Sequence, residues 1–129
     1  MSEPIVFISH FSVKEGKLDA YRQLQREVTM LLQAEKPRTL VFLTYVSENG
    51  TEMSAIHVFA DAESMDLHFQ GSDVRGRPAY EFLVPAGWEI YGSPSDDVIE
   101  TMRRLAESSS VTLTVQHDYV AGFLRPAAS

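Results

Sequence analysis

Apolar and polar positions follow two different periods in the first part of the chain. Residues 4–13 place β-branched and aromatic side chains at both parities, which predicts a strand covered on both faces. An amphipathic helix is predicted over residues 17–35, where apolar side chains repeat at helical spacing: Leu18, Tyr21, Leu24, Val28, Leu31 and Leu32. Pro37 ends this helix because it lacks a backbone donor and clashes with the preceding turn. This pattern is typical of a helix that packs on a sheet.

A hairpin signal follows this helix. Residues 38–47 and 52–60 are rich in β-branched and aromatic residues, and Asn49 and Gly50 lie between them. Asn-Gly favours a two-residue hairpin because both central residues of a type I′ turn need a positive φ. The two segments are therefore predicted to pair as antiparallel strands. Alternation puts four residues on one face of the second of these strands: Met53, Ala55, His57 and Phe59.

Two short helical segments and a fourth strand complete the first ninety residues. Asp61 is a favourable entry to a helix that carries His68, and a second helical piece is predicted over residues 74–84, before Pro85 breaks it. Residues 87–92 form the fourth predicted strand. The order βαββαβ is that of the ferredoxin-like arrangement, so the sequence predicts an α+β fold.

One more helix and one more strand are predicted at the C-terminal end. Ser95 caps a helix whose apolar face consists of Val98, Ile99, Met102 and Leu105. Residues 111–119 alternate between apolar and polar side chains, which predicts an edge strand with one wet face. We therefore divide the chain into a ferredoxin-like domain over residues 1–93 and a helix–strand extension of that domain over residues 94–129.

Apolar side chains on both faces of the first strand predict a homodimer. One face carries Ile5, Phe7 and Phe11, and the other carries Val6 and Ile8. Helices on only one side of the sheet leave the second face uncovered, and an exposed apolar face of that extent usually marks an interface. Two copies are therefore expected to associate through their sheet faces.

The composition excludes several classes of site. The 129 residues include no cysteine, which excludes disulfides, zinc–thiolate sites, iron–sulfur clusters and a cysteine nucleophile. No HExxH or similar ligand spacing occurs, so no metal is expected. A GxSxG nucleophile elbow and a Gly-rich phosphate loop are also missing from the sequence, so neither serine hydrolase chemistry nor a nucleotide cofactor is indicated.

Charge and hydropathy bear on partners and location. The formal net charge of −7 disfavours nucleic acid and anionic membrane surfaces as partners. The first residues lack the basic start and apolar run of a signal peptide, and no stretch approaches the roughly 18 apolar residues of a membrane span. A cytoplasmic location is therefore expected.

Two blocks of sequence resemble the antibiotic biosynthesis monooxygenase family. In the first block, residues 5–21, a β-branched strand leads through Val-Lys-Glu-Gly-Lys into an amphipathic helix, where the family usually has Val-Lys-Pro-Gly-Lys. In the second, residues 58–72, a strand end and an acidic turn precede a helix that carries His68 before Ser72. Phe59 stands where the family commonly has Trp, and the match covers about residues 4–92.

The resemblance implies a fold and a reaction class. Family members are usually homodimers whose sheets associate into a dimeric α/β barrel. Some oxidise phenols or quinols with molecular oxygen, without metal or flavin, whereas others have no demonstrated activity. The chain is therefore expected to be a cofactor-independent monooxygenase-like protein for a small aromatic or quinol-type substrate. The alternatives are a non-catalytic homodimeric module that binds a small ligand or is structural, and an isomerase or decarboxylase that consumes no oxygen.

His68 is the main catalytic candidate, as a proton acceptor or anchor near neutral pH. The alternative is a helical histidine that is solvated or bonded to a backbone carbonyl. A related branch of the family degrades heme with an Asn on the first strand and with a Trp and a His. Here Ser9 and His68 stand at the Asn and Trp positions, so heme degradation is not expected. Ser9 is instead a candidate hydrogen-bonding point of a substrate pocket, or simply a small buried serine.

The remaining candidates are aromatic residues and three further histidines. An aromatic pocket, or alternatively a filled core, is predicted from four residues: Tyr45, Phe59, Tyr80 and Trp88. His10 and His57 are expected on neighbouring strands, at a dimer interface or a strand edge rather than on a metal. His117 and its neighbours either cover a pocket mouth or lie at a surface strand end.

Overall fold

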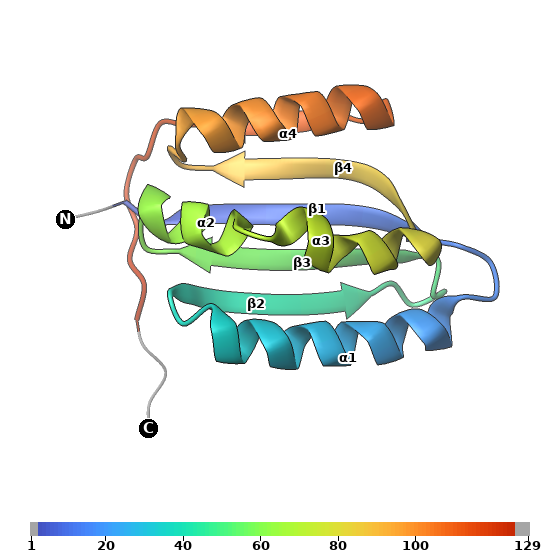
Figure 1. The fold of residues 1–129 in the computed structure, drawn as a ribbon. Coiled ribbons are helices and arrows are strands. Elements are labelled where there is room, and N and C mark those ends of the chain that lie inside the picture. The colour runs from blue at the N-terminus through green and yellow to red at the C-terminus, as the bar shows by residue number, and fades with distance from the viewer. Residues whose placement is uncertain (1–2, 126–129) are drawn as a thin grey trace.

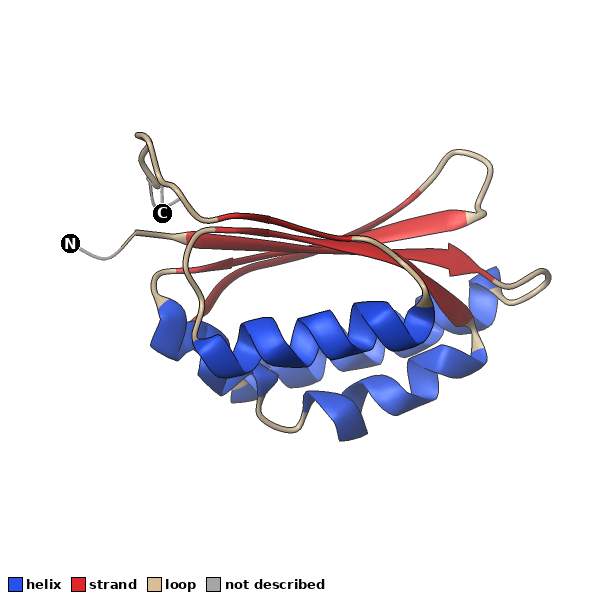
Figure 2. Ribbon diagram, turned by 90° about the horizontal axis from the view of Figure 1, so that it is seen from above, coloured by secondary structure: helices blue, strands red, loops and turns tan. Residues whose placement is uncertain are grey.

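The computed structural model describes residues 3–125, which contain a five-stranded sheet with all the helices on one face (Figures 1 and 2). The strands are β1 (Ile5–Val13), β2 (Thr39–Val46), β3 (Glu52–Phe59), β4 (Leu83–Tyr91) and β5 (Leu113–Gln116), in the sheet order β2-β3-β1-β4-β5. Neighbouring strands are antiparallel except β4 and β5, which are parallel. The sheet is open, and β1 is its central strand.

The helices form a layer that covers one face of the sheet (Figure 2). The other face carries no helix, and we call it the open face. They are α1 (Leu18–Glu35), α2 (Ala62–Phe69), α3 (Ser72–Gly76), the 3₁₀ helix η1 (Arg77–Glu81) and α4 (Asp96–Ser109). Asp61 and Ser95 cap α2 and α4, because each side chain accepts a hydrogen bond from a backbone N–H three residues on. Within residues 3–125, no helix is long and apolar enough to cross a membrane.

The predicted α+β fold with an extra C-terminal helix and strand is confirmed, with two differences in strand length. β4 begins at Leu83, although a helix was predicted to continue to residue 84. Pro85 lies inside the strand because the register between β1 and β4 shifts there: Phe11 is opposite Pro85 and His10 is opposite Gly87. Proline is tolerated at such a bulge, since it has no N–H to place in the ladder. The second difference is that β5 is shorter than the predicted strand over residues 111–119.

Alternation along β1 separates two environments. Phe7 and Ser9, which the sequence predicted to share one face of this strand, are buried under the helices, whereas Ile8 faces the open side. Ile8 is opposite Ile56 of β3, which in turn is opposite Leu43 of β2. These three residues form an apolar row across three strands of the open face, and Leu43 is 46% exposed in the single chain.

β1 pairs with β3, so His10 and His57 lie on neighbouring strands, but on opposite faces of the sheet. His10 is opposite Ser54 on the open face, where its Nδ1 lies 2.9 Å from the Ser54 hydroxyl and its Nε2 contacts Glu89. His57 is opposite Phe7 and is buried under the helices. The prediction that His57 lies at an interface or strand edge is therefore wrong, because its parity in β3 differs from that of Ser54.

The C-terminal helix contributes to the main hydrophobic core. Four of its side chains are buried against the strands: Val98, Ile99, Met102 and Ala106. They share one cluster with residues of β1, β3 and β4, among them Ile5, Phe59 and Ile90. Burial at this spacing of three and four residues is what the amphipathic pattern of the helix predicted.

Ile99→Ala tests whether α4 stabilises the whole domain. Ile99 is 8% exposed, and we expect its truncation to lower the free energy of unfolding by about 2–5 kcal/mol, because it leaves a cavity in the shared core. Arg103→Ala, on the exposed face of the same helix, should change it by no more than about 0.5 kcal/mol. Urea unfolding of both variants measures the difference, and equal stabilities would contradict a shared core.

Candidate functional site

A cavity of about 740 Å³ lies between the helices and the buried face of the sheet. Its walls come from strands β1 to β4, from α1 and α4, and from the segment from α2 to η1, and most of the lining side chains are apolar or aromatic. Four of the residues predicted for the site border it: Ser9, His68, Tyr80 and Trp88. A largely apolar cavity with a few polar side chains is the usual form of a small-ligand site.

Two histidines meet at one wall of this cavity. The ring centroids of His57 and His68 are 5.0 Å apart, and the two planes are almost perpendicular at 79°. Phe7 and Phe42 each lie 5.0 Å from the His57 ring, and Phe59 lies 5.2 Å from the His68 ring. Both imidazoles are therefore held in an aromatic environment that fixes their orientation.

His57 is neutral and its tautomer is determined by its backbone partner. Nδ1 lies 3.0 Å from the carbonyl oxygen of Phe7, and because a carbonyl only accepts hydrogen bonds, Nδ1 carries the proton. Burial is the main cause that lowers the pKa of His57 to about 4; the bond to Phe7 opposes it, and the positive charge of Arg75 adds a smaller effect in the same direction as burial. Nε2 is therefore unprotonated at neutral pH and offers a lone pair.

His68 is also neutral, and its surroundings are more strongly positive. Its Nδ1 lies 2.7 Å from the hydroxyl of Thr39, a group that both donates and accepts. Burial is the main cause that lowers the pKa of His68 to about 3, followed by repulsion from the His57 ring, which is charged once acid protonates it, and by the charges of Arg75 and Lys36.

The two cations beside His68 also hold the end of α2. The Lys36 ammonium donates to the carbonyl oxygens of Leu67 at 2.7 Å and Gln70 at 3.0 Å. The Arg75 guanidinium donates to the carbonyl oxygens of His68 at 2.8 Å and Gln70 at 3.2 Å. These bonds satisfy carbonyls that a helix end leaves unpaired, and the positive charges are favourable at the negative end of the helix dipole.

Several polar atoms of the cavity wall remain free for a ligand. Among the described residues, no fully enclosed side-chain nitrogen or oxygen lacks a hydrogen-bond partner. The Ser9 hydroxyl, the Trp88 indole N–H and the Nε2 atoms of His57 and His68 have no partner within residues 3–125, so they must be in contact with open space. All four residues line the cavity, which is therefore that space. Ser9 and Trp88 are direct cross-strand neighbours.

The structure does not bring Phe59 and Tyr45 to the cavity. Phe59 is 0% exposed and packs behind the histidines as part of the core. Tyr45 is 59% exposed and is opposite Ser54, so alternation along β2 turns it toward the open face. His117 also lies elsewhere, exposed near the end of β5 with its Nδ1 3.2 Å from the carbonyl oxygen of Gly92.

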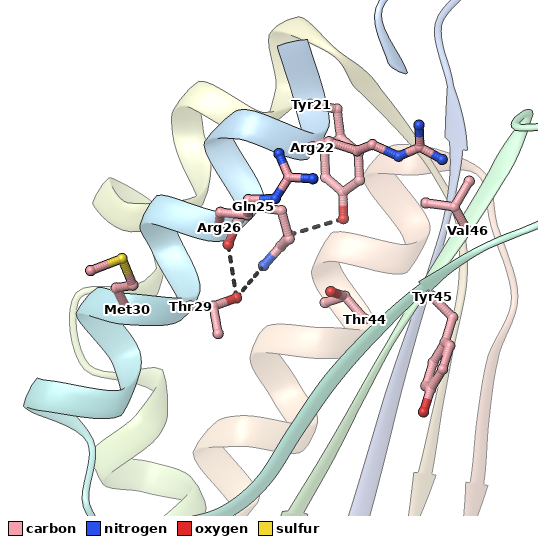
Figure 3. Close-up of a pocket in the computed structure, with 9 residues that line it drawn as sticks. All are labelled: Tyr21, Arg22, Gln25, Arg26, Thr29, Met30, Thr44, Tyr45 and Val46. Carbon is pink, nitrogen blue, oxygen red and sulfur yellow. Dashed lines mark hydrogen bonds between the residues drawn. The ribbon is translucent and has the colours of Figure 1, made fainter. Parts of the chain in front are cut away.

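Tyr45 instead borders a separate groove between α1 and β2 (Figure 3). This groove has a volume of about 670 Å³, and a chain of side-chain bonds runs along its α1 wall. The Tyr21 hydroxyl donates to Gln25 at 2.9 Å, and Gln25 donates to Thr29 at 3.3 Å. The side-chain polar groups of Tyr21, Gln25 and Thr29 on this wall therefore bond to one another.

Sequence reasoning missed His57 and Arg75 as members of the site. The signal for His57 was present, because it alternates with Met53, Ala55 and Phe59, and a strand face with so many apolar residues is buried. Arg75 gave no such signal. It belongs to a short helix that the sequence does not delimit, and its role follows from the position of the α2 carbonyls.

Comparison with known proteins identifies the fold but no sequence relative. No family model and no curated protein matches the sequence. Among solved structures, MupZ from Pseudomonas fluorescens matches 95% of this chain and 91% of its own, with a TM-score of 0.67 and 15% identity. Because so little of the chain is left out, this match must include most of the C-terminal helix and strand.

Two further structures match a smaller share of this chain. SnoaB, a cofactor-independent oxygenase from Streptomyces nogalater, has a TM-score of 0.60 at 11% identity, over 73% of this chain and 96% of its own. A protein provisionally named antibiotic biosynthesis monooxygenase from Nitrosomonas europaea has a TM-score of 0.61 at 16% identity, over 72% and 92%. At these identities the likeness establishes the fold.

The neutral state of the two buried histidines predicts a loss of stability in acid. Their folded-state pKa values, about 4 and about 3, lie below the ordinary value of 6.5, so the unfolded chain binds protons first as the pH falls. Stability should be complete above about pH 6.5 and decrease below it, by up to about 1.4 kcal/mol per pH unit for each histidine.

Urea unfolding between pH 7.5 and 5 at one protein concentration measures this slope. His68→Gln should reduce it by one histidine's share, whereas His117→Gln, which replaces an exposed histidine, should leave it unchanged. If the free energy of unfolding of His68→Gln depends on pH as steeply as that of the wild type, His68 is not buried in the neutral state.

Proposed function

We propose that this chain, which has the fold of antibiotic biosynthesis monooxygenase domains, oxidises a small aromatic or quinol-type substrate with molecular oxygen and without a cofactor. The cavity carries this proposal. His57, His68, Ser9 and Trp88 all line it with polar atoms that have no partner within residues 3–125, and most of the remaining wall is apolar or aromatic. The likeness to SnoaB supports the reaction class by analogy of fold.

The chain's chemical task in this reaction is to remove a proton. An imidazole Nε2 takes the proton of a substrate hydroxyl, the O–H bond breaks, and its electron pair stays on the substrate. The anion then passes one electron to oxygen, and the substrate radical and superoxide combine to form a C–O bond. Loss of water leaves one oxygen atom in the product, and the substrate itself supplies the electrons. General base catalysis of this kind typically contributes 10²- to 10⁴-fold.

The other site residues orient the substrate ring. The Trp88 ring packs edge-on against Phe11 at 6.1 Å, and Phe11 packs edge-on against Tyr80 at 6.3 Å, so the three form one aromatic wall. Tyr80 is 42% exposed and belongs to the outer part of this wall. The Ser9 hydroxyl and the Trp88 N–H supply hydrogen bonds to the substrate's polar edge, and His68 serves as base or anchor.

Ligand binding without turnover is the second candidate function. It is favoured by the low pKa of both imidazoles, because a weak base accepts a proton only when the anion beside it is stabilised. A binding protein would use the same cavity and the same free polar atoms. Only the oxygenase consumes oxygen. A binding protein does not, and neither does the alternative isomerase or decarboxylase.

We also propose that the protein is a homodimer through the open sheet face. The row formed by Leu43, Ile56 and Ile8 supports this, since such apolar area is seldom left in water. Beside it, Glu89 accepts a bond from the Tyr91 hydroxyl at 2.5 Å and contacts His10, and these partners lower the pKa of its carboxyl group. Paired polar groups of this kind are compatible with burial in an interface.

Oxygen uptake tests the proposed reaction. Protein dialysed against a chelator should consume oxygen with a hydroquinone or anthrone-like phenol, and one atom of labelled oxygen should appear in the product. Trp88→Ala should lower kcat/KM by about tenfold or more, because the aromatic wall loses its largest ring. Saturable ligand binding without any oxygen uptake would instead establish the binding function.

Ile56→Asp tests the dimer. A carboxylate in the centre of the open face should produce a monomer in light scattering, because an unpaired charge is strongly unfavourable in an apolar interface. Val74→Asp, at a position in α3 that is 64% exposed on the helix side of the sheet, is the matched control and should leave the dimer intact. A wild-type monomer, or a dimer for Ile56→Asp, would place the interface elsewhere or exclude it.

A further inference from the structure

We propose that His57, rather than His68, is the proton acceptor of this cavity, and that His68 positions the His57 ring. The inference rests on the proposed function, and it also determines what the substrate must carry, namely an ionisable hydroxyl on an aromatic ring. His57 is a catalytic residue in this account because its free nitrogen touches the substrate. His68 acts on the substrate through His57.

The direction of the His57 lone pair is fixed by the fold. Phe7 lies directly opposite His57 in the β1–β3 ladder, and its carbonyl oxygen is 3.0 Å from Nδ1. The central strand cannot shift without breaking the ladders on both its sides, so this acceptor is held in place. The proton of the neutral ring therefore stays on Nδ1, and Nε2 presents a lone pair to the cavity in every molecule.

In His68 the position of the proton is not fixed in this way. Its Nδ1 partner is the Thr39 hydroxyl, which bonds equally well as donor or as acceptor, so either nitrogen can carry the proton. The surrounding charge also disfavours protonation of His68. Lys36 and Arg75 both bond to carbonyls at the end of α2, next to His68, so a proton on His68 would add a third positive charge there.

The state after proton transfer is also more favourable at His57 than at His68. The substrate O–H bond breaks, the Nε2–H bond of His57 forms, and the electron pair stays on the substrate oxygen until oxygen accepts an electron. The new imidazolium keeps its Nδ1–H bond to the Phe7 carbonyl, and a hydrogen bond to the charged form stabilises it. The same bond raises the pKa of His57 against the effect of burial, whereas every cause acting on His68 lowers its pKa.

His68 has a defined role in this arrangement. Its ring lies edge-on to the His57 ring at 5.0 Å, and its own position is set by Thr39 and by the two cations at the end of α2. Together with Phe42 on another side of the His57 ring, it prevents the imidazole from turning its lone pair away from the cavity.

Two ligands of the same shape test the inference without turnover. Trp88 is the only tryptophan in the chain and lines the cavity, so its fluorescence reports binding. We expect 2-naphthol to bind about five- to tenfold more tightly than 2-methoxynaphthalene, because only the hydroxyl donates a hydrogen bond to Nε2. His57→Phe should abolish this preference. His68→Phe should retain it, although both ligands should bind more weakly.

The preference measured in the variants decides the assignment. If wild-type protein shows no preference, if neither ligand quenches Trp88, or if His68→Phe alone removes the preference, His57 is not the acceptor. His57→Leu serves as a second variant if the phenylalanine disturbs folding, and His117→Phe, at an exposed site, controls for the loss of a histidine.

Steady-state kinetics separate this inference from the proposed function. With an oxidisable substrate, His57→Phe should lower kcat at least hundredfold with little change in KM, and His68→Phe should lower it less than tenfold. The reverse order overturns the inference while leaving the oxygenase proposal standing. If no substrate consumes oxygen, the oxygenase proposal fails, and the naphthol preference still decides whether His57 is the acceptor.

Discussion

The central strand β1 is the constraint on which the other features depend. It is hydrogen-bonded to β3 on one side and to β4 on the other, so its register is fixed and each of its residues belongs permanently to one face. Phe7 and Ser9 thereby line the cavity, and Ile8 belongs to the open apolar row. The same ladder holds the Phe7 carbonyl in front of His57. One strand therefore connects the candidate site to the face through which the chain is proposed to dimerise.

The burial of two imidazoles in an aromatic cluster is unfavourable for stability unless they stay neutral and keep their hydrogen bonds. Each retains one bond, to Phe7 or to Thr39, and leaves its second nitrogen toward the cavity. For His57 this second nitrogen is an acceptor, because the bond to Phe7 keeps the proton on Nδ1, and no group within residues 3–125 bonds to it. A packed core would have enclosed it or replaced it with an apolar side chain, and so its accessibility supports a role in binding.

Much of the fold could be predicted because it depends on local periodicity. Alternation assigned Phe7 and Ser9 to one face of β1 and Ile8 to the other, and the cap at Ser95 marked the start of α4. The site was predicted only in part, because it depends on which faces meet. The aromatic character of Tyr45 suggested a pocket residue, although its parity in β2 excludes it. The bulge that admits Pro85 and the contacts of Arg75 arise from distant segments, and no local pattern reports them.

In this protein the cavity is expected to bind a hydroxyaromatic compound against the two imidazoles. A crystal structure of the protein grown with 2-naphthol would show whether it does. We expect the ring in the cavity beside Trp88, with its oxygen within hydrogen-bonding distance of Nε2 of His57. A ligand in the groove between α1 and β2, or a cavity closed by side chains with His57 Nε2 bonded to the protein, would contradict it.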